Sequence, residues 1–408
     1  MTTAGHALII GAGIAGPTMA LALERAGIEA SLFEAYSEPA HYAGLFLNTA
    51  SNGLDALRVI GVEVAESADG FPMPRMVMWS GAGKRLGEVA NGVALADGTV
   101  SICVRRGLLQ KTLSDQALDR RISIHHGKRL DSYAVTDTGV VARFADGTEA
   151  SGDILIGADG IHSRTRQLLN PDAPRPRFTG MLSIGGYSRV PDLPPTTGTQ
   201  HFVLGKRAFF GYLVREDGEI YWFANLYRDH EPTRRELAAV SPSQWKQQLF
   251  EQFADDLPVI GRIIENTTGE IGAYPVHDIP TSPVWHRGPV ALIGDAVHAT
   301  SPSAGQGASM AIEDAVTLAR CLRDIPDITT AFGTYESMRR DRVEKVVAYS
   351  KAISNSKAAG PVGRVFRDLM MPLALKLFAN SSSHAWMYTH HIDWDAPVAP
   401  VPEGSPSG

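Results

Sequence analysis

The chain has 408 residues, 44% of them hydrophobic and 20% charged, which is typical of a soluble globular protein with two domains or one large composite. Its formal net charge of −6 argues against nucleic acid or an anionic membrane as the main partner. Cys103 and Cys321 form no CxxC motif, only six residues precede the first apolar strand at Ala7, and no apolar run reaches the ~18 residues of a membrane span. We therefore predict a cytoplasmic protein without a metal site, with monomer and homodimer both left open.

The first 35 residues predict a βαβ unit with the motif GAGIAG between its first strand and its helix. The first glycine of such a motif permits a tight turn, the second lets a pyrophosphate approach the backbone, and the third lets helix and strand pack closely. Glu34 ends the second strand, where it can accept hydrogen bonds from both hydroxyls of an adenosine ribose and would repel a 2′-phosphate. The unit therefore predicts bound FAD or NAD. The residues assigned to this nucleotide are Gly11, Gly13, Ile14, Ala15, Gly16, Glu34 and Ala35.

The middle of the chain predicts strands. Glycine-containing turns at 81–83, 137–139 and 146–147 indicate hairpins, and a helix is expected from about Arg106. After a Pro-rich crossing at 170–178 the pattern changes as far as about residue 270, and the aromatic and β-branched stretch 199–229 predicts antiparallel sheet, with turns at 205–206 and 217–218.

Two acidic turns follow buried strands. Asp159-Gly160 is consistent with a plain turn, although Ser163 and Arg166 fall on one face of the helix expected after it. In "ALIGDAVHATSPSAGQGASMAIEDA", Asp295 can accept hydrogen bonds from a polyol, the glycines let backbone approach a flat ring, and a helix from about Gln306 directs its positive end at that ring. This pattern describes the ribityl chain and isoalloxazine of FAD. The residues assigned here are Asp159, Gly160, Gly294, Asp295, Pro302, Gly305, Gln306, Gly307 and Ala308.

The order of these three motifs resembles the class A flavoprotein monooxygenases, the para-hydroxybenzoate hydroxylase family, from about residue 5 to 395. "VRRGLLQKTL" resembles that family's Arg-x-x-Leu-(Gln/His)-x-x-Leu motif, which places Arg106 on FAD, and "NTASNGLDALRVIG" resembles the segment near the flavin. The chain departs from the family at Val297, where Ala is usual, at Ser309, where Asn is common, and in "PAHYAGLFL", which lacks an arginine found in many members.

The resemblance implies an α/β fold with a Rossmann-like FAD-binding domain, an antiparallel β-sheet substrate domain and C-terminal helices. We expect the FAD-binding domain to comprise 1–72, 98–175 and 271–330, and the substrate domain to comprise 73–97 and 176–270. A helical region would follow over 331–395. Within it, 362–379 is expected to form a packed helix pair, with an interfacial amphipathic helix as the alternative. The Pro, Gly and Ser content of 396–408 predicts a disordered tail.

The resemblance also implies the chemistry. NAD(P)H would reduce non-covalently bound FAD, and O₂ would give a flavin C4a-hydroperoxide that hydroxylates or epoxidises an aromatic or polycyclic molecule in a site kept dry. No second nucleotide fold is found, so NAD(P)H is expected to bind transiently at the same cleft. The pocket candidates are Leu47, Phe210, Tyr212, Trp222, Phe223, Asn225 and His277. Strand alternation lets only about half of neighbouring positions face the flavin.

Several alternatives stay open. No catalytic base is identified, so hydroxylation and epoxidation are both retained. We expect a structural hydrogen bond for His298 and an ordinary sheet position for His201. An FAD-dependent oxidase, dehydrogenase or saturase would share Glu34 and Asp295, and a non-enzymatic FAD-binding protein would lack a substrate cavity under the sheet. A halogenase is disfavoured because Trp-x-Trp-x-Ile-Pro does not occur.

Overall fold

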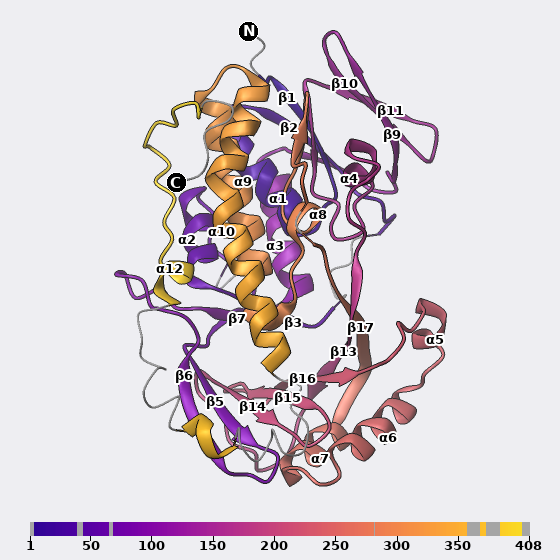
Figure 1. The fold of residues 1–408 in the computed structure, drawn as a ribbon, viewed down its shortest axis with the longest axis vertical. Coiled ribbons are helices and arrows are strands. Elements are labelled where there is room, and N and C mark those ends of the chain that lie inside the picture. Colours follow the sequence, from indigo (N-terminus) through magenta and orange to yellow (C-terminus); the bar gives the residue numbers. More distant parts are fainter. Residues whose placement is uncertain are drawn as a thin grey trace.

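The computed structural model describes residues 4–38, 44–64, 68–280, 282–356, 368–372 and 384–401, which form two large sheets (Figure 1). The first sheet is parallel except at its β18 edge. In spatial order its strands are β18 (His286–Arg287), β19 (Val290–Leu292), β12 (Ile154–Gly157), β1 (His6–Ile10), β2 (Glu29–Phe33) and β8 (Ser123–His125).

Helices pack around this parallel sheet, as its crossover connections require. They are α1 (Ala15–Arg25), α2 (Ser51–Val59), α3 (Arg106–Asp119), α9 (Gly307–Asp324) and the long α10 (Ile328–Ser356). The β1–α1–β2 segment confirms the predicted βαβ unit: the two strands pair in parallel, and Met19, Leu21 and Leu23 of α1 are fully buried. Helix α10 lies along α9 (Figure 1).

The second sheet has seven strands. In spatial order they are β17 (Thr267–Asp278), β13 (Arg177–Ser188), β16 (Ile220–Tyr227), β15 (Phe209–Val214), β14 (Thr199–Leu204), β5 (Arg75–Ser80) and β6 (Arg85–Ala90). The predicted hairpins are confirmed, but β14 and β5 pair in parallel because β5 comes from a distant part of the chain. Strand β17 continues past residue 270 to Asp278.

Three helices, which the sequence analysis did not predict, lie between β16 and β17. They are α5 (Arg234–Ala238), α6 (Pro242–Phe253) and α7 (Pro258–Glu265). Ser241 and Gln244 form a capping box at the start of α6, with Pro242 as the first helical residue. The apolar side of α6 then packs against the sheet.

The remaining elements are short. β3 (Phe46–Thr49), β7 (Ile102–Arg105) and β4 (Phe71–Pro72) form one small sheet, and β9 (Leu130–Thr136), β10 (Gly139–Phe144) and β11 (Glu149–Gly152) form the predicted hairpins of another. The short helices are α4 (Arg164–Leu169), α8 (Asp295–His298), α12 (Ala385–Tyr388) and the 3₁₀ turn η1 (Pro302–Ala304).

The predicted disorder of the tail is wrong for residues 396–401. The Ala396 carbonyl accepts a hydrogen bond from Arg320 at 2.8 Å, the Val398 amide donates to Asp324 at 2.8 Å, and the Val401 amide donates to Thr334 at 3.1 Å. These contacts fasten the segment to α9 and α10. Residues 402–408 lie outside the described residues. So does most of the predicted helix pair, of which only 368–372 are described, as helix.

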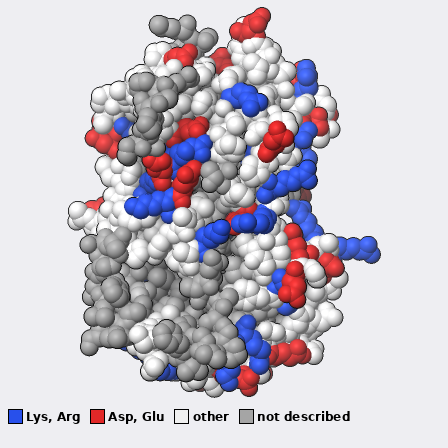
Figure 2. Space-filling model, viewed as in Figure 1, with Lys and Arg blue, Asp and Glu red and all other residues white. Residues whose placement is uncertain are grey.

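On the face seen in Figure 2, Lys and Arg side chains lie interspersed with Asp and Glu. Within the described ranges, no helix combines the length and the apolar character needed to cross a membrane.

Candidate active site

The glycine loop lies at the carboxyl end of β1. Gly11 has φ +101°, and a Cβ there would lie 2.6 Å from the Ala158 carbonyl oxygen; a Cβ on Gly16 would lie 1.9 Å from the Gly11 carbonyl oxygen. The tight turn and the close helix packing predicted for these glycines are therefore confirmed. No heavy atom lies within 4 Å of a Cβ placed on Gly13, so the backbone is open where the pyrophosphate was predicted. Ile14 caps α1, and Ala15 is its first residue.

Two side chains hold the loop from either side. Glu34, just after β2, accepts hydrogen bonds from the backbone amides of Ala12 at 2.8 Å and Tyr36 at 3.0 Å. Gln110 of α3 donates to the Ala12 carbonyl at 2.7 Å. Sequence reasoning assigned Glu34 and the half-buried Ala35 to the ribose, and it missed the anchoring by Gln110, although the Arg-x-x-Leu-Gln motif contained the signal.

The three motifs that are distant in sequence meet at one edge of the parallel sheet. A Cβ on Gly11 would lie 3.0 Å from the Asp159 Cα, and a Cβ on Gly294 would lie 3.5 Å from the Ala15 Cβ. This follows from the pairing of β1 with β12 and of β12 with β19. Ligands of such sheets bind at the carboxyl ends of the strands.

Asp159 is engaged mainly in local structure. Its carboxylate accepts hydrogen bonds from the Ser163 hydroxyl at 2.5 Å and from the amide and hydroxyl of Thr165 at 2.9 and 3.0 Å. Burial raises the pKa of Asp159, and these hydrogen bonds oppose that shift. Ser163 also caps α4, and Gly160 has φ +74°. The plain-turn interpretation thus accounts for the described contacts of Asp159, and its contact with a nucleotide stays a prediction.

Arg166 joins the two acidic turns. It is only 1% exposed and donates hydrogen bonds at 2.7 Å to the carbonyls of Ile161 and of Ala296 in α8. Because one guanidinium bonds to both segments, it fixes their separation.

Asp295 is the first residue of α8. Its side chain is exposed to solvent, yet the surrounding protein raises its pKa, against the opposing charges of His298 and Arg106. Gly294 caps α8 with φ +58°. Arg106 is exposed, and its guanidinium makes no hydrogen bond or ion pair with the part of the chain that the structure describes.

The start of α9 borders the same region. Gly305 has φ +63°, and a Cβ there would lie 3.9 Å from the Cβ of Asn48 in β3. A Cβ on Gly307, the first residue of α9, would meet no atom within 4 Å. The first amides of a helix, here those of Gly307 and Ala308, have no intrahelical acceptor. Open space beside such donors fits a planar group that becomes negative.

The two other residues assigned to this segment flank these glycines. Pro302 is exposed in η1. Gln306, which caps α9, is buried and accepts a hydrogen bond from Asn52 at 3.1 Å.

A buried ionic network joins the Gly294 turn and α8 to α9 and α10. Asp314 of α9 accepts hydrogen bonds from His298, from the Gly294 amide at 2.9 Å and from the Arg339 guanidinium at 2.8 Å. Burial acts to raise the pKa of Asp314, but the charges of His298 and Arg339 lower it below its ordinary value. The structural hydrogen bond predicted for His298 is confirmed. The sequence signal for the network, which reasoning missed, was the acidic pair Glu313-Asp314, flanked on both sides by apolar residues of α9.

The pocket prediction is wrong for Phe210, Tyr212 and Trp222. These side chains lie on the face of the seven-stranded sheet that packs against α6 and α7, because alternation along β15 and β16 directs them away from the FAD-binding domain. His201 is a sheet residue as expected, and its Nδ1 accepts from the Trp79 indole at 3.2 Å. His277 bonds Glu231 at 2.9 Å.

The opposite face of the sheet meets β3. Phe46 of β3 contacts the rings of Tyr221 and Phe223, with centroid distances of 5.3 and 5.9 Å. Asn225 shares this face and is 5% exposed, and its side chain makes no hydrogen bond to the described residues. Leu47 also belongs to β3. Since β3 continues to Asn48 beside Gly305, it lies between the aromatic face and the start of α9.

Residues 5–350 match the family model described as FAD binding domain. The chain is 32% identical over 356 residues to aurachin C monooxygenase/isomerase of Stigmatella aurantiaca, covering 86% of this chain and 90% of the relative. It is 32% identical over 358 residues to FAD-dependent urate hydroxylase of Klebsiella pneumoniae, covering 84% and 87%. The crystal structure of Klebsiella pneumoniae HpxO complexed with FAD and uric acid superposes with a TM-score of 0.81 at 26% identity, covering 94% of this chain and 97% of the other.

Proposed function

The chain belongs to the FAD binding domain family and is an FAD-dependent monooxygenase, and from this premise we propose that it adds one oxygen atom to a flat, largely apolar ring compound, by hydroxylation or epoxidation. NAD(P)H is the reductant typical of this family. The relatives described above are a monooxygenase and a hydroxylase, which favours this function over an FAD-dependent oxidase, dehydrogenase or saturase.

The residues at the sheet edge fit FAD. The open backbone at Gly13 and Gly307 leaves room for a ligand that contacts the main chain, and Glu34 and Asp295 present carboxylates at the two ends of the site. When bound, FAD supplies hydride acceptance and the activation of O₂. The chain itself would hold the ribose through Glu34 and the ribityl hydroxyls through Asp295. The amino end of α9 would stabilise negative charge on the ring by ~0.3 to 2 kcal/mol.

The aromatic sheet face that meets β3 supports the substrate proposal. Phe202, Phe209 and Phe223 form one cluster on it, with Met371 of the 368–372 segment packed against them, and no residue of α6 or α7 belongs to this cluster. Such a surface suits a flat apolar ring and keeps water from the reacting atoms. Asn225 is a buried polar group on this face that could orient the substrate by a hydrogen bond.

The test is a screen of FAD-loaded protein with aromatic and polycyclic compounds. We expect some of them to stimulate NAD(P)H oxidation and to gain one oxygen atom by mass spectrometry. Asn225→Leu should raise the KM of an accepted compound by about tenfold or less, since it removes one neutral hydrogen bond worth ~0.5 to 1.5 kcal/mol. The proposal fails if compounds stimulate oxidation and release only hydrogen peroxide. It also fails if a compound is oxidised without consumption of NAD(P)H.

We also propose that FAD is bound non-covalently and that the protein is cytoplasmic. The two cysteines, Cys103 and Cys321, are free and buried, which suits a reducing compartment. Acid precipitation should release the flavin into the supernatant; colour that stays with the pellet would overturn non-covalent binding.

A further inference from the structure

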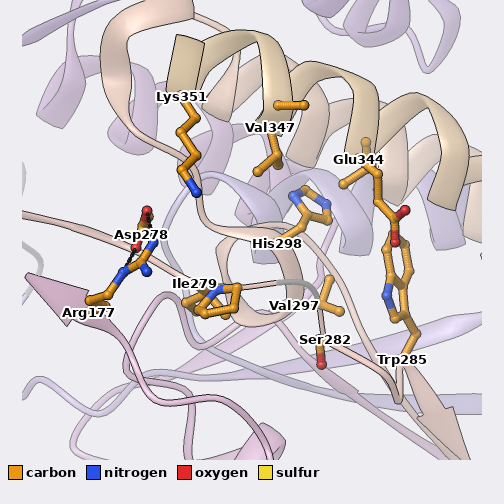
Figure 3. Close-up of a pocket in the computed structure, with 13 residues that line it drawn as sticks. Arg177, Asp278, Ile279, Ser282, Trp285, Val297, His298, Glu344, Val347 and Lys351 are labelled. Carbon is orange, nitrogen blue, oxygen red and sulfur yellow. Dashed lines mark hydrogen bonds and ion pairs between the residues drawn. The ribbon is translucent and has the colours of Figure 1, made fainter. Parts of the chain in front are cut away.

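A separate cavity of about 340 Å³ lies beside α10 (Figure 3). Its walls come from one side of α10, from α8, from Arg177 at the start of β13, and from the end of β17 with the residues that follow it. None of the residues assigned to FAD lines it, and no side chain of the aromatic sheet face does so. The cavity is therefore distinct from the site proposed for catalysis.

The floor of this cavity is apolar and held in place. Ile279, Trp285 and Val297 line it and are each at most 2% exposed, so they belong to the packed interior. The Arg340 guanidinium lies 5.0 Å from the centre of the Trp285 ring. His298, beside Val297, is fixed by its hydrogen bond to Asp314. A ligand entering here would meet a preformed surface, which lowers the ordering cost of binding.

The charged groups of the lining are paired except for one. Arg177 makes a two-point ion pair with Asp278 at 2.8 and 3.0 Å, and Glu344 pairs with Arg340 at 3.2 Å. Lys351 has no partner among the residues the structure describes. Figure 3 shows its amine directed from α10 toward the cavity. The cavity thus combines an apolar floor with one uncompensated positive charge at its rim.

We propose that this cavity is a second binding site, for an aromatic monocarboxylate. The ring would lie against the accessible apolar lining, Pro280, Val347 and Ala348, above the buried floor, and the carboxylate would accept hydrogen bonds from Lys351. A dianion is disfavoured because Asp278 and Glu344 border the same space. The proposal does not rest on the substrate proposed for the aromatic sheet.

The test uses FAD-loaded full-length protein and isothermal titration with 2-naphthoate, with neutral 2-naphthamide as the charge control. Ala348 is exposed and lines the cavity, so Ala348→Trp should fill the opening without disturbing the interior and abolish this binding. Lys351→Met should weaken 2-naphthoate binding by up to about fivefold, as expected for an exposed ion pair, and leave 2-naphthamide unaffected.

Two matched controls lie on the same helix. Ala352 is exposed and does not line the cavity, and Lys345 lies 4.1 Å from the Trp386 ring instead. Ala352→Trp and Lys345→Met should bind 2-naphthoate like the parent protein. The proposal is overturned if the parent shows no binding, or if Ala348→Trp leaves the affinity unchanged. Loss of 2-naphthoate binding on Phe223→Ala, with Ala348→Trp unaffected, would place the ligand in the sheet pocket and overturn it as well.

Discussion

Glu34 shows how one side chain can serve both the fold and a ligand. Its carboxylate already accepts the Ala12 and Tyr36 amides, so removing it loosens the glycine loop as well as the predicted ribose contact. Hydrogen bonds to a charged acceptor are worth ~1.5 to 3 kcal/mol each. We therefore expect Glu34→Ala to weaken FAD binding by about tenfold to 100-fold or more. Glu34→Gln, which keeps an acceptor oxygen, should have a smaller effect.

Titration of FAD into FAD-free protein, followed by flavin fluorescence, measures both variants. Equal affinity of the parent and Glu34→Ala would show that the carboxylate serves the loop alone. Turnover in protein kept saturated with FAD should change little, because the ribose is remote from the reacting ring.

Asp295 gives a prediction about pH. The surrounding protein desolvates this carboxyl and raises its pKa above the ordinary Asp value, although the charges of His298 and Arg106 oppose the shift. If the ionised form accepts the ribityl hydrogen bonds, FAD affinity is complete above this raised pKa and is lost as pH falls through it. We expect the loss to begin at higher pH than for an ordinary Asp, and Asp295→Asn to bind FAD more weakly without this pH dependence. FAD titrations between neutral and mildly acidic pH measure it; an unchanged pH profile in the variant would contradict the assignment.

At the scale of elements, α9 and α10 are joined by buried charges. Arg339 is 1% exposed and pairs with both Glu313 and Asp314, which are fully buried. Removing the cation would leave two buried carboxylates under-compensated, which costs about 3 to 5 kcal/mol. We expect Arg339→Met to lower the unfolding free energy by that amount in urea titrations of FAD-free protein.

The exposed pair of Arg143 and Glu149 is the control for that experiment. These side chains pair at 2.7 Å between β10 and β11 and are each 52% exposed, so Arg143→Met should cost about 1 kcal/mol or less. Adding Asp314→Asn to Arg339→Met should recover part of the loss. Equal stabilities of the two single variants would mean that the buried network contributes no more than a surface pair.

The amino end of α9 carries a prediction about coupling. A Cβ on Gly307 meets nothing in the protein within 4 Å, so Gly307→Leu should fold and should place its side chain in the space predicted for the flavin ring. We expect NAD(P)H oxidation to continue with release of hydrogen peroxide and little oxygenated product. Peroxide and product are quantified against NAD(P)H consumed, and full coupling in this variant would contradict the predicted ring position.

For the whole molecule, local patterns predicted more than long-range packing did. The βαβ unit, the hairpins and the convergence of three motifs followed from glycines, alternation and the rule that parallel strands end at one edge. The tail over 396–401 could not be predicted from composition, because contacts with α9 and α10 order it. The helices over 234–265 could have been found, since Ser241 and Gln244 have the spacing of a capping box.

The two faces of the seven-stranded sheet show most clearly what could not be predicted from the sequence. Alternation shows that Phe223 and Asn225 share one face and that Phe210 and Trp222 share the other. It does not show which face meets β3 and which meets α6, because that depends on how distant elements pack. For this reason some of the predicted pocket residues lie on the face proposed to bind the substrate, and others lie in the hydrophobic core on the α6 side.

This division can be tested with two substitutions of the same kind. Phe210 is fully buried against Trp222 and Phe253, so Phe210→Ala should cost about 3 to 5 kcal/mol of unfolding free energy and leave KM and coupling near those of the parent in folded protein. Phe223 is half-buried and contacts Phe46, so Phe223→Ala should cost less stability but open the aromatic face to water. Its expected signature is a higher KM and more hydrogen peroxide per NAD(P)H consumed. Urea unfolding, KM and peroxide yield are measured on both proteins below the temperature at which Phe210→Ala begins to unfold. If Phe210→Ala uncouples the reaction while Phe223→Ala does not, the substrate lies on the α6 side of the sheet and the assignment of the two faces is reversed.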